Sequence, residues 1–181
     1  VFKLDPRGNF IDEIRKIKPQ IVFNALHGRY GEDGFVQSIL ESEKIKYTHS
    51  GVLASSLAID KEISKTIFIK NKINTPKYLI FNYNNDENLF IELKKKKINF
   101  PVVVKPINEG SSLGVEVCKN KHELYRATKK LFKKYDQLIF EEYVGGQEIQ
   151  VAVINSEPLG AIELVPRRLF YDYKAKYTKG A

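Results

Sequence analysis

The sequence predicts an α/β protein, because short runs of β-branched residues alternate with segments whose apolar residues recur at helical spacing. The chain has 181 residues, of which 43% are hydrophobic and 29% are charged. This composition is apolar enough for a folded core and lacks the polar bias of a disordered chain. No apolar run approaches the roughly 18 residues that a membrane-spanning helix needs. We therefore expect no contact with a membrane.

The first part of the chain is expected to hold two short strands, each followed by a helix. Residues 21–23 are typical of a buried strand that leads into a polar loop over residues 24–34. The apolar residues between 35 and 40 then recur at helical spacing, and a short strand is expected around Tyr47. A single helix should follow over residues 54–72, with its isoleucines on one face.

The second part of the chain is expected to contain more strands than helices. One helix carries the apolar residues of 89–93 behind a cap at Asn85-Asp86. Another begins at a capping box formed by Asn120 and Glu123. The segment after the glycine- and serine-rich loop should be the hairpin partner of the strand before that loop. The predicted strands are 78–81, 102–105, 115–118, 138–140, 149–154 and 161–165.

The positive charge of the chain raises the question of nucleic-acid binding. The formal net charge is +8 and the pI is about 9.4, with lysine runs such as Lys94-Lys95-Lys96-Lys97. Clustered cations can bind nucleic acid by releasing counterions from phosphates. The runs lack interleaved arginine and aromatic residues, and a solvated helix face has the same composition. We expect no nucleic-acid partner, and a basic nucleic-acid-binding module is the alternative from a different class.

The cysteine content and the first residues bear on the compartment. The single cysteine, Cys118, cannot form an intramolecular disulfide, which fits a reducing compartment. No charged segment followed by an apolar one opens the chain, so no signal peptide is expected. The chain also lacks methionine, even at its first position, which suggests a piece of a longer protein. These features predict a cytoplasmic protein.

Lys105 ends a buried apolar strand, and a glycine- and serine-rich loop follows over residues 109–114. A lysine in this place is costly unless its ammonium group meets an anion or water. The amides and hydroxyls of such a loop can turn towards phosphate oxygens, which predicts a polyphosphate cradle. The spacing fits neither a Walker A motif nor G-x-G-x-x-G. An ordinary glycine-rich hairpin turn with a surface lysine explains the spacing equally well.

A later apolar strand delivers Glu141 and Glu142, followed by Gly145-Gly146 and then Glu148. Carboxylates can accept hydrogen bonds from an adenine amino group and from ribose hydroxyls. The glycine pair allows a hinge or a close approach of the backbone. If this segment stood alone, a polar strand end with surface acids would be the better interpretation.

Two loops hold further candidate residues. His27 lies in the glycine-rich loop 25–34, at the carboxyl end of a presumed parallel strand, where open α/β sheets bind ligands. Residues 170–178 alternate aromatic and cationic side chains without clean periodicity. A mobile lid over a charged substrate has this pattern, and so does a tail disordered by truncation.

Six segments in series carry a resemblance to a known family. In this order and with these gaps they resemble the D-alanine–D-alanine ligases of the ATP-grasp superfamily, and they run almost end to end through the chain. The segments are Ala-Leu-His-Gly-Arg-x-Gly-Glu-Asp-Gly (25–34), Thr-His-Ser-Gly-Val-Leu-Ala-Ser (48–55), Ile-Asp-Lys (59–61), Val-Val-Val-Lys-Pro (102–106), Glu-Gly-Ser-Ser-Leu-Gly-Val (109–115) and Phe-Tyr-Asp-Tyr-Lys-Ala-Lys-Tyr (170–177).

The resemblance implies an enzyme that uses ATP to phosphorylate the carboxylate of a first D-alanine. The amine of a second D-alanine then attacks the acyl phosphate, and inorganic phosphate leaves. The product, D-alanyl-D-alanine, is a precursor of peptidoglycan. The alternatives are ligases that make D-alanyl-D-lactate or D-alanyl-D-serine, and the tyrosine at 177 favours D-alanine.

The resemblance also implies which residues bind ATP. Lys61 and Lys105 would contact the phosphates, and the backbone of Ser112 would cover the terminal one. The residues expected at the adenine and the ribose are Glu141, Glu142, Val144 and Glu148.

The catalytic residues that the resemblance implies lie in three loops. His27 would sit near the carboxyl group of the first D-alanine. Ser111 and Tyr177 would belong to a hydrogen-bonded bridge that ties the lid shut. Lys176 would offer positive charge to the substrate carboxylate or to the forming phosphate.

The implied organisation is a partial Rossmann-like N-terminal substrate domain over 1–60, followed by an ATP-grasp domain whose C-terminal part is truncated. Its central subdomain would cover 61–147, and the start of its C-terminal subdomain, with the lid, would cover 148–181. The ligands of Mg²⁺ (or Mn²⁺) would lie beyond Ala181, so no metal ligand is expected in the chain. The piece alone would be inactive, and the whole enzyme would be a homodimer acting on ATP and D-alanine.

Overall fold

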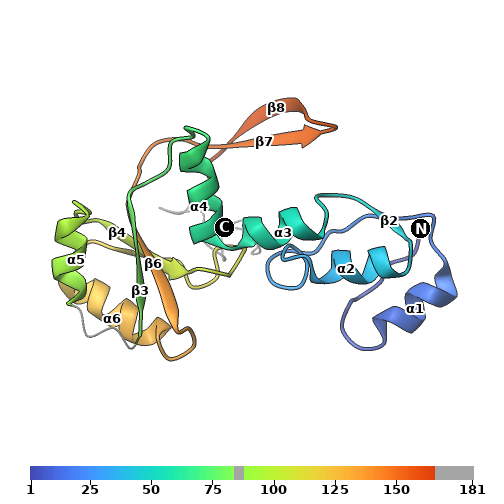
Figure 1. The fold of residues 1–181 in the computed structure, drawn as a ribbon, viewed down its shortest axis with the longest axis horizontal. Helices are drawn as coiled ribbons and strands as arrows, with labels where there is room; N and C mark the ends of the chain where they lie inside the picture. The colour runs from blue at the N-terminus through green and yellow to red at the C-terminus, as the bar shows by residue number, and fades with distance from the viewer. Residues whose placement is uncertain (84–87, 166–181) are drawn as a thin grey trace. The chain divides into compact units, whose positions relative to one another are not determined.

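The computed structural model describes residues 1–83 and 88–165 of the chain (Figure 1). These residues form two units, and each is described by itself. The first unit contains residues 1–70 and 108–110, and the second contains the described residues of 71–107 and 111–165. Both units combine helices and strands, which confirms the predicted mixed fold. None of the helices in these ranges has the length and apolar character needed to cross a membrane.

The first unit contains two short parallel strands joined through a helix, which is the βαβ connection that parallel pairing requires. Ile14 and Leu40 are buried in its core, where Val22 and Tyr47 from the two strands pack against them. The elements are α1 (Phe10–Ile17), β1 (Ile21–Val22), α2 (Phe35–Ser42), β2 (Lys46–Tyr47), α3 (Val52–Ile59) and α4 (Lys61–Lys70).

The strand at the start of the first unit differs from the prediction of a buried strand. β1 forms where it was expected, but Ile21 is 60% exposed and Phe23, which follows it, is 74% exposed. Within the described part of the chain, β1 pairs with β2 alone. The prediction of burial was therefore wrong, because only the face of β1 that carries Val22 packs against the described core of this unit.

The single helix predicted over residues 54–72 is two helices, α3 and α4, separated at Asp60. The backbone of Asp60 is extended (φ −78°, ψ 110°), which ends α3. Its Oδ1 accepts hydrogen bonds from the amides of Glu62 (3.0 Å) and Ile63 (2.9 Å), which caps the start of α4. The apolar period continues across this break, so the pattern alone did not reveal it.

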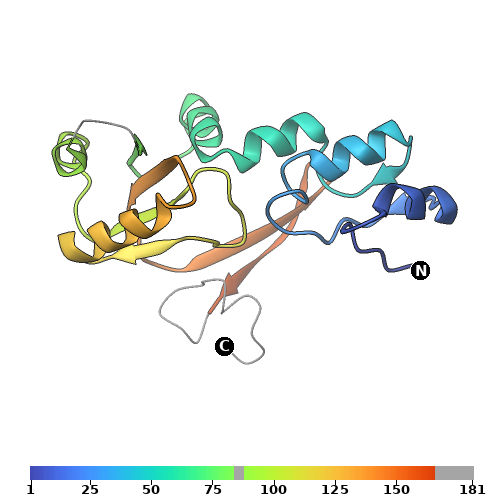
Figure 2. The same ribbon diagram turned by 90° about the horizontal axis from the view of Figure 1, so that it is seen from below.

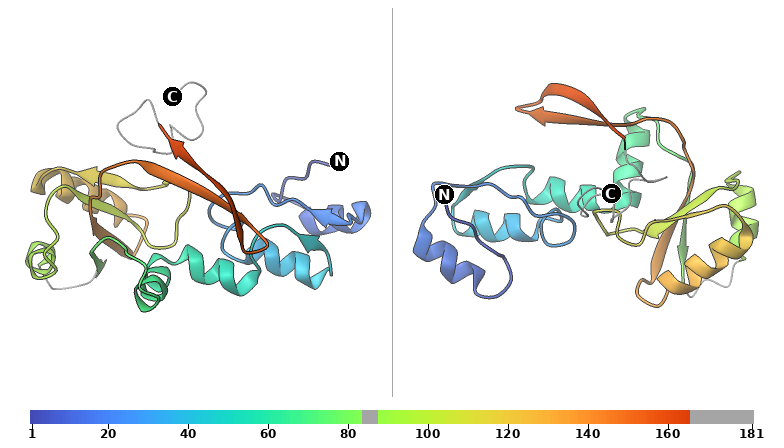
Figure 3. Two further views of the ribbon diagram at one scale, coloured as in Figure 1. Left: turned by 90° about the horizontal axis from the view of Figure 1, so that it is seen from above. Right: turned by 180° about the vertical axis from the view of Figure 1, so that it is seen from behind.

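The second unit is built around an antiparallel sheet with strand order β3-β6-β4-β5. Alternate residues of its strands face α5 and α6, which lie on one side of the sheet (Figure 3). The strands form where the sequence predicted them, and β5 is the hairpin partner of β4 as expected. The elements are β3 (Tyr78–Asn82), α5 (Leu89–Lys95), β4 (Val102–Pro106), β5 (Glu116–Cys118), α6 (Lys121–Leu131) and β6 (Gln137–Glu142).

The core of the second unit lies between this sheet and its two helices. Leu124 and Leu131 of α6 are buried there, and Cys118 of β5 is 2% exposed. Burial, together with the nearby charges of Glu116 and Glu123, raises the pKa of the Cys118 thiol to about 11. The thiol is therefore protonated at neutral pH.

The cap of α5 differs from the prediction. Asn88 is the N-cap, and its side chain accepts a hydrogen bond from the amide of Phe90 at 3.0 Å. The predicted cap, Asn85-Asp86, lies outside the described residues and precedes the cap that the helix uses. Several Asn and Asp residues stand next to one another here, so the sequence alone could not select among them.

The capping box of α6 is confirmed. The side chain of Asn120 accepts from the amide of Glu123 at 2.9 Å, and the carboxylate of Glu123 accepts from the amide of Lys119 at 2.8 Å. The hydrogen bond from Lys119 is the main reason why the pKa of Glu123 is lowered. The box thus satisfies two amides at the helix start.

A two-stranded antiparallel hairpin also belongs to the second unit. Its strands are β7 (Glu148–Ile154) and β8 (Glu157–Leu164), and Figure 2 shows them as a long ribbon. The register shifts between Ala152 and Val153, at a bulge or irregularity. Both strands were predicted, and the structure extends β8 towards its start.

Candidate functional site

Lys105 and Glu141 form an ion pair on the face of the sheet that points away from α5 and α6. Pairing of β4 with β6 sets Val103 opposite Glu141 and Lys105 opposite Ile139, so the two charged residues are diagonal neighbours. The Lys105 Nζ lies 2.6 Å from the Glu141 Oε2. The Glu141 side chain is only 7% exposed and that of Lys105 is 22% exposed. The carboxylate charge is therefore matched inside the fold, while the ammonium keeps a solvent-facing side that can meet an anion.

The other expected adenine and ribose residues follow along the same strand and beyond it. The Glu142 carboxylate accepts from the Lys77 amide at 3.1 Å and lies 3.5 Å from the Lys77 ammonium. Val144 is exposed between β6 and β7, and Glu148 begins β7. The Glu142 side chain is thus engaged with Lys77, and the Glu142 amide also donates to the Lys77 carbonyl at 3.0 Å.

The loop between β4 and β5 has an unusual backbone. Ser111 and Ser112 both adopt positive φ angles (50° and 58°), a conformation that is uncommon outside glycine. Gly114 also has a positive φ of 72°, and an added Cβ there would lie 3.0 Å from Pro106. Backbone conformations of this kind persist only where the surroundings hold them, and they concentrate at functional sites. The loop expected to contact phosphate is therefore tightly specified.

In the first unit, acidic side chains hold the loop that carries His27. The Glu32 carboxylate accepts a short hydrogen bond from the Gly28 amide and lies 3.9 Å from the His27 Nδ1. The Asp33 carboxylate accepts from the Tyr30 amide at 2.9 Å. These contacts fix the loop while the His27 side chain stays 61% exposed, so the imidazole is positioned and accessible.

His27 and Glu32 line a hollow of about 510 Å³ in the first unit, together with His49. The Nε2 of His49 lies 2.7 Å from the carbonyl oxygen of Asn24. A carbonyl only accepts, so Nε2 is the protonated nitrogen, an assignment that follows from the hydrogen bond. The hollow therefore contains two imidazoles and a carboxylate, a set that suits a small zwitterion. Sequence reasoning gave His49 no role, although it stands in one of the family segments.

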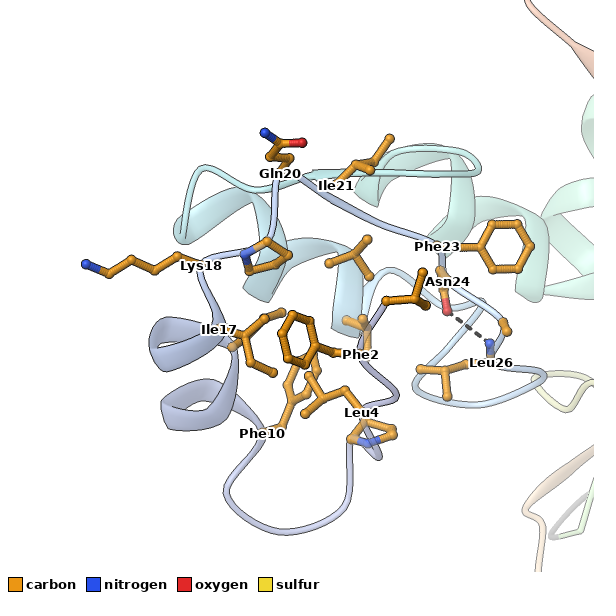
Figure 4. A pocket seen from close by; sticks show the side chains of 17 residues that line it. Phe2, Leu4, Phe10, Ile17, Lys18, Gln20, Ile21, Phe23, Asn24 and Leu26 are labelled. Carbon is orange, nitrogen blue, oxygen red and sulfur yellow. Dashed lines mark hydrogen bonds between the residues drawn. The ribbon is translucent and has the colours of Figure 1, made fainter.

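A larger hollow of about 690 Å³ shares residues 23–26 with the first one (Figure 4). Its walls are mostly apolar and include Phe2, Phe10 and Ile17. Figure 4 also shows the hydrogen bond from the Leu26 amide to the Asn24 side chain, 3.1 Å long, which shapes the wall shared by both hollows. None of the site residues predicted from the sequence lines this larger hollow in the part of the chain that is described. We assign it no part in the chemistry.

Lys61, the first residue of α4, donates a short hydrogen bond to the backbone carbonyl of Glu109. Glu109 belongs to the first unit, although it immediately precedes Gly110 and Ser111 in the chain. The structure thus places Lys61 at the start of the loop expected to contact phosphate. Lys61 and Lys105 belong to different units, and their predicted meeting around one triphosphate stays a prediction.

The remaining predicted residues, Lys176 and Tyr177, lie outside the described residues. Within residues 1–83 and 88–165, no three His, Cys, Asp or Glu side chains gather in a group that could hold a metal ion.

The sequence matches the family described as "D-ala D-ala ligase C-terminus" over residues 67–181. The D-alanine–D-alanine ligase of Pelagibacter ubique is 55% identical over 177 residues, which are 98% of this chain and 58% of the relative. The chain belongs to the D-alanine–D-alanine ligase family. The ligase of Wolbachia pipientis wMel is 42% identical over 98% of this chain and 55% of its own length. The chain thus spans about half the length of these curated ligases.

Solved ligase structures share the fold. The crystal structure of the Bacillus anthracis D-alanine–D-alanine ligase has a TM-score of 0.77 and 38% identity, covering 93% of this chain and 55% of that one. A structure of that ligase complexed with ATP has a TM-score of 0.74 and 31% identity, covering 90% and 55%. These structural relatives agree with the ATP-grasp-like fold that the family resemblance implied.

Proposed function

We propose that the whole protein of which this chain is part ligates two D-alanines to D-alanyl-D-alanine, using ATP, for the synthesis of peptidoglycan precursors. Membership of the ligase family supports this function. The observation that carries it in this chain is the Lys105–Glu141 pair at the end of β4, directly before the loop with positive φ angles at Ser111 and Ser112. A fixed cation next to a constrained loop of amides suits a polyphosphate.

The chemistry requires charge stabilisation more than covalent help from the protein. The carboxylate of the first D-alanine attacks the terminal phosphorus of ATP, and ADP leaves. The amine of the second D-alanine then attacks the acyl carbon, the carbon–oxygen bond to phosphate breaks, and inorganic phosphate leaves with a proton lost from the amine. Lys61 and Lys105 would stabilise the negative charge on the phosphates, and the Ser112 backbone would cover the terminal one.

Contacts to the rest of the nucleotide are proposed for residues after Lys105. Glu141 would lie at the adenine while its carboxylate stays paired with Lys105. Glu142 and Val144 would contribute mainly backbone, which agrees with the engagement of the Glu142 side chain by Lys77. Glu148, at the start of β7, would accept hydrogen bonds from the ribose hydroxyls.

The hollow of the first unit is the proposed place for the first D-alanine. His27, whose imidazole is exposed beside Glu32, would lie near its carboxyl group. Ser111 and Tyr177 would close the lid, and Lys176 would supply positive charge to the substrate carboxylate or the forming phosphate. A bridge between Ser111 and Tyr177 would also exclude water from the acyl phosphate.

Mg²⁺ or Mn²⁺ is proposed to accompany ATP in the whole protein, where a divalent ion neutralises phosphate charge. The described residues offer no acidic cluster that fits such an ion. We therefore assign it no ligand among them and derive no step through it.

The remaining proposals concern organisation. The parallel β1–α2–β2 connection supports a partial Rossmann-like domain over residues 1–60. The central ATP-grasp subdomain would cover 61–147, and the C-terminal subdomain would begin at 148. We further propose a cytoplasmic homodimer without nucleic-acid or membrane partners.

The test is release of inorganic phosphate by the whole protein with ATP and D-alanine. Release that depends on D-alanine, with D-alanyl-D-alanine as product, is the expected result. If D-lactate or D-serine competes successfully with D-alanine as the second substrate, that compound would be the second substrate instead. ATP-independent binding of nucleic acid with steep salt dependence, and no phosphate release, would contradict the ligase function.

A further inference from the structure

Two glycines from distant parts of the sequence touch through their backbones in the first unit. A Cβ added at Gly110 would lie 2.6 Å from the Cα of Gly28 and 3.2 Å from its nitrogen. It would also lie 3.0 Å from the Glu32 Oε2. Backbone atoms cannot swing aside as the tip of a flexible side chain can. Position 110 therefore has room for glycine and for no other residue.

Position 28 requires glycine for a different reason. A Cβ there would keep ordinary contact, 3.7 Å from the Cα of Gly110, but the φ of Gly28 is +68°. This left-handed conformation is strained for residues that carry a Cβ. Gly110 has no such φ, so its requirement is one of space alone. The two glycines thus meet because the positive φ of Gly28 turns its loop towards Gly110, and because Gly110 has no side chain that would block the approach.

Other contacts hold the same two segments. Lys61 donates to the carbonyl of Glu109, and the Glu32 carboxylate accepts from the Gly28 amide. Segment 109–110 is therefore fixed on one side by the start of α4 and on the other by the loop of Gly28. All of these residues belong to the first unit.

We propose that Gly110 is a positioning residue whose contact with Gly28 sets where the serine loop begins relative to His27. In the chain, His27 directly precedes Gly28, and Ser111 and Ser112 directly follow Gly110. The inference rests on the proposed function, in which His27 holds the D-alanine to be phosphorylated and Ser112 covers the terminal phosphate. Neither Gly28 nor Gly110 touches the substrates in that scheme. A carboxylate and a phosphorus atom must come to within about 3–3.5 Å, and a misplacement of about 1 Å can slow such a reaction about 100-fold.

The test is the Gly110→Ala variant of the whole protein, with kcat and KM measured for ATP and for D-alanine. A methyl group at 110 must push the two segments apart, so we expect kcat to fall on the order of 100-fold. The KM for ATP should change less than about threefold, because the phosphate contacts themselves remain. Partial unfolding would also lower the apparent kcat without changing KM, so kcat is calculated per folded enzyme, with the folded fraction measured by urea unfolding of the same sample.

Gly51→Ala is the matched control. Gly51 lies in the same unit with an ordinary extended backbone, and an added Cβ would lie 3.7 Å from the Glu41 carboxylate and 3.8 Å from the Tyr47 hydroxyl. This variant should keep wild-type kinetics. If Gly110→Ala is as active as Gly51→Ala, the positioning role is overturned while the ligase function stands.

A measurement on the unmodified protein keeps the proposal testable even if Gly110→Ala does not fold. The Gly28 amide, hydrogen-bonded to Glu32 and covered by Gly110, should exchange its hydrogen far more slowly than an exposed amide. Exchange at the rate of a free peptide would overturn the contact. If the wild-type protein releases no D-alanine-dependent phosphate, the proposed function fails and the positioning role falls with it.

Discussion

The two units hold their predicted phosphate-contacting lysines by different means. In the second unit, Lys105 meets a buried carboxylate, and the pairing of β4 with β6 places the two side chains together. In the first unit, Lys61 meets a backbone carbonyl, that of Glu109, contributed by a segment far along the chain. Lys105 is positioned by the register of a sheet, and Lys61 is positioned by the conformation of the loop that contains Glu109.

The difference shows which kind of substitution each region tolerates. A sheet register depends on many backbone hydrogen bonds, so it survives the loss of one side chain, and that loss acts mainly through the charge left behind. The conformation of two contacting loops depends on a few glycines, which leave room for the backbone or adopt positive φ angles. Adding one methyl group at such a glycine therefore changes the conformation of both loops. Substitutions that remove a charge should therefore have the larger effect in the second unit. Substitutions that add side-chain volume should have the larger effect in the first unit.

The largest effect is expected from Lys105→Ala, because it removes a cation that lies 2.6 Å from a buried carboxylate. The free energy of unfolding should fall by about 3 kcal/mol, and the affinity of the whole protein for ATP should fall about tenfold or more. Lys77→Ala is the control, because Lys77 pairs with Glu142 at 3.5 Å where both side chains are more exposed. It should cost less than about 1 kcal/mol. Urea unfolding of both variants measures this, and equal losses would contradict the importance of burial.

Gly34→Ala should have the next largest effect and tests the sensitivity of the first unit to volume. Gly34 has a φ of +94°, and an added Cβ would lie 2.5 Å from the Ser56 Oγ and 2.8 Å from the Val52 carbonyl oxygen. We expect a loss of about 2–3 kcal/mol from strain and crowding together. Urea unfolding beside Gly51→Ala gives the comparison. If Gly34→Ala and Gly51→Ala have similar stability, the loops of the first unit adapt easily to added volume. That result would weaken the contrast between the two units.

Lys61→Met should have a smaller effect on stability than Lys105→Ala. It removes the hydrogen bond to the Glu109 carbonyl but leaves no buried charge, so the expected loss is about 1–2 kcal/mol. Thermal unfolding of the two variants side by side tests the order. A larger loss for Lys61→Met would show that the loop contact, and not the ion pair, is the more important anchor.

The smallest effect is expected from acid. The pKa of Glu123 is lowered from its ordinary value of 4.5 mainly by the hydrogen bond from the Lys119 amide, and that of Glu43 is lowered mainly by the side chain of Arg15. A carboxyl group whose pKa is lowered by folding stabilises the fold above its unfolded pKa, and this stabilisation disappears as the pH falls through the folded pKa.

Both units should therefore lose stability as the pH falls below about 4.5. Glu123→Gln and Glu43→Gln should each reduce that loss, which thermal unfolding between about pH 6 and pH 3 would measure. A variant with an unchanged pH profile would show that its carboxyl group does not contribute.

Much of the second unit could be predicted because its signals are local. The β-branched run of β4 and the capping box of α6 each lie within a few residues of the element that they specify. The break at Asp60 was missed because the isoleucine period runs through it, although an aspartate is a common helix cap. The local sequence pattern thus predicted which helices and strands form better than it predicted the residues at which they begin and end.

The candidate site divides in the same way. Lys105 was found from its own strand, but its pairing with Glu141 depends on the register between two strands and could not be read from either one. His49 was missed because a lone histidine beside a turn carries no signal until its contact with Asn24 is known. The contact of Gly28 with Gly110 likewise requires the folded path of both loops.

The buried thiol in the core of the second unit makes the protein convenient for spectroscopy. Cys118 is the only cysteine of the chain, and its pKa of about 11 keeps it in the unreactive form at neutral pH. A cysteine introduced on an exposed loop would therefore take up a maleimide dye selectively, with no need to remove the native one. A dye pair placed in this way on the two units would report their separation as nucleotide is added.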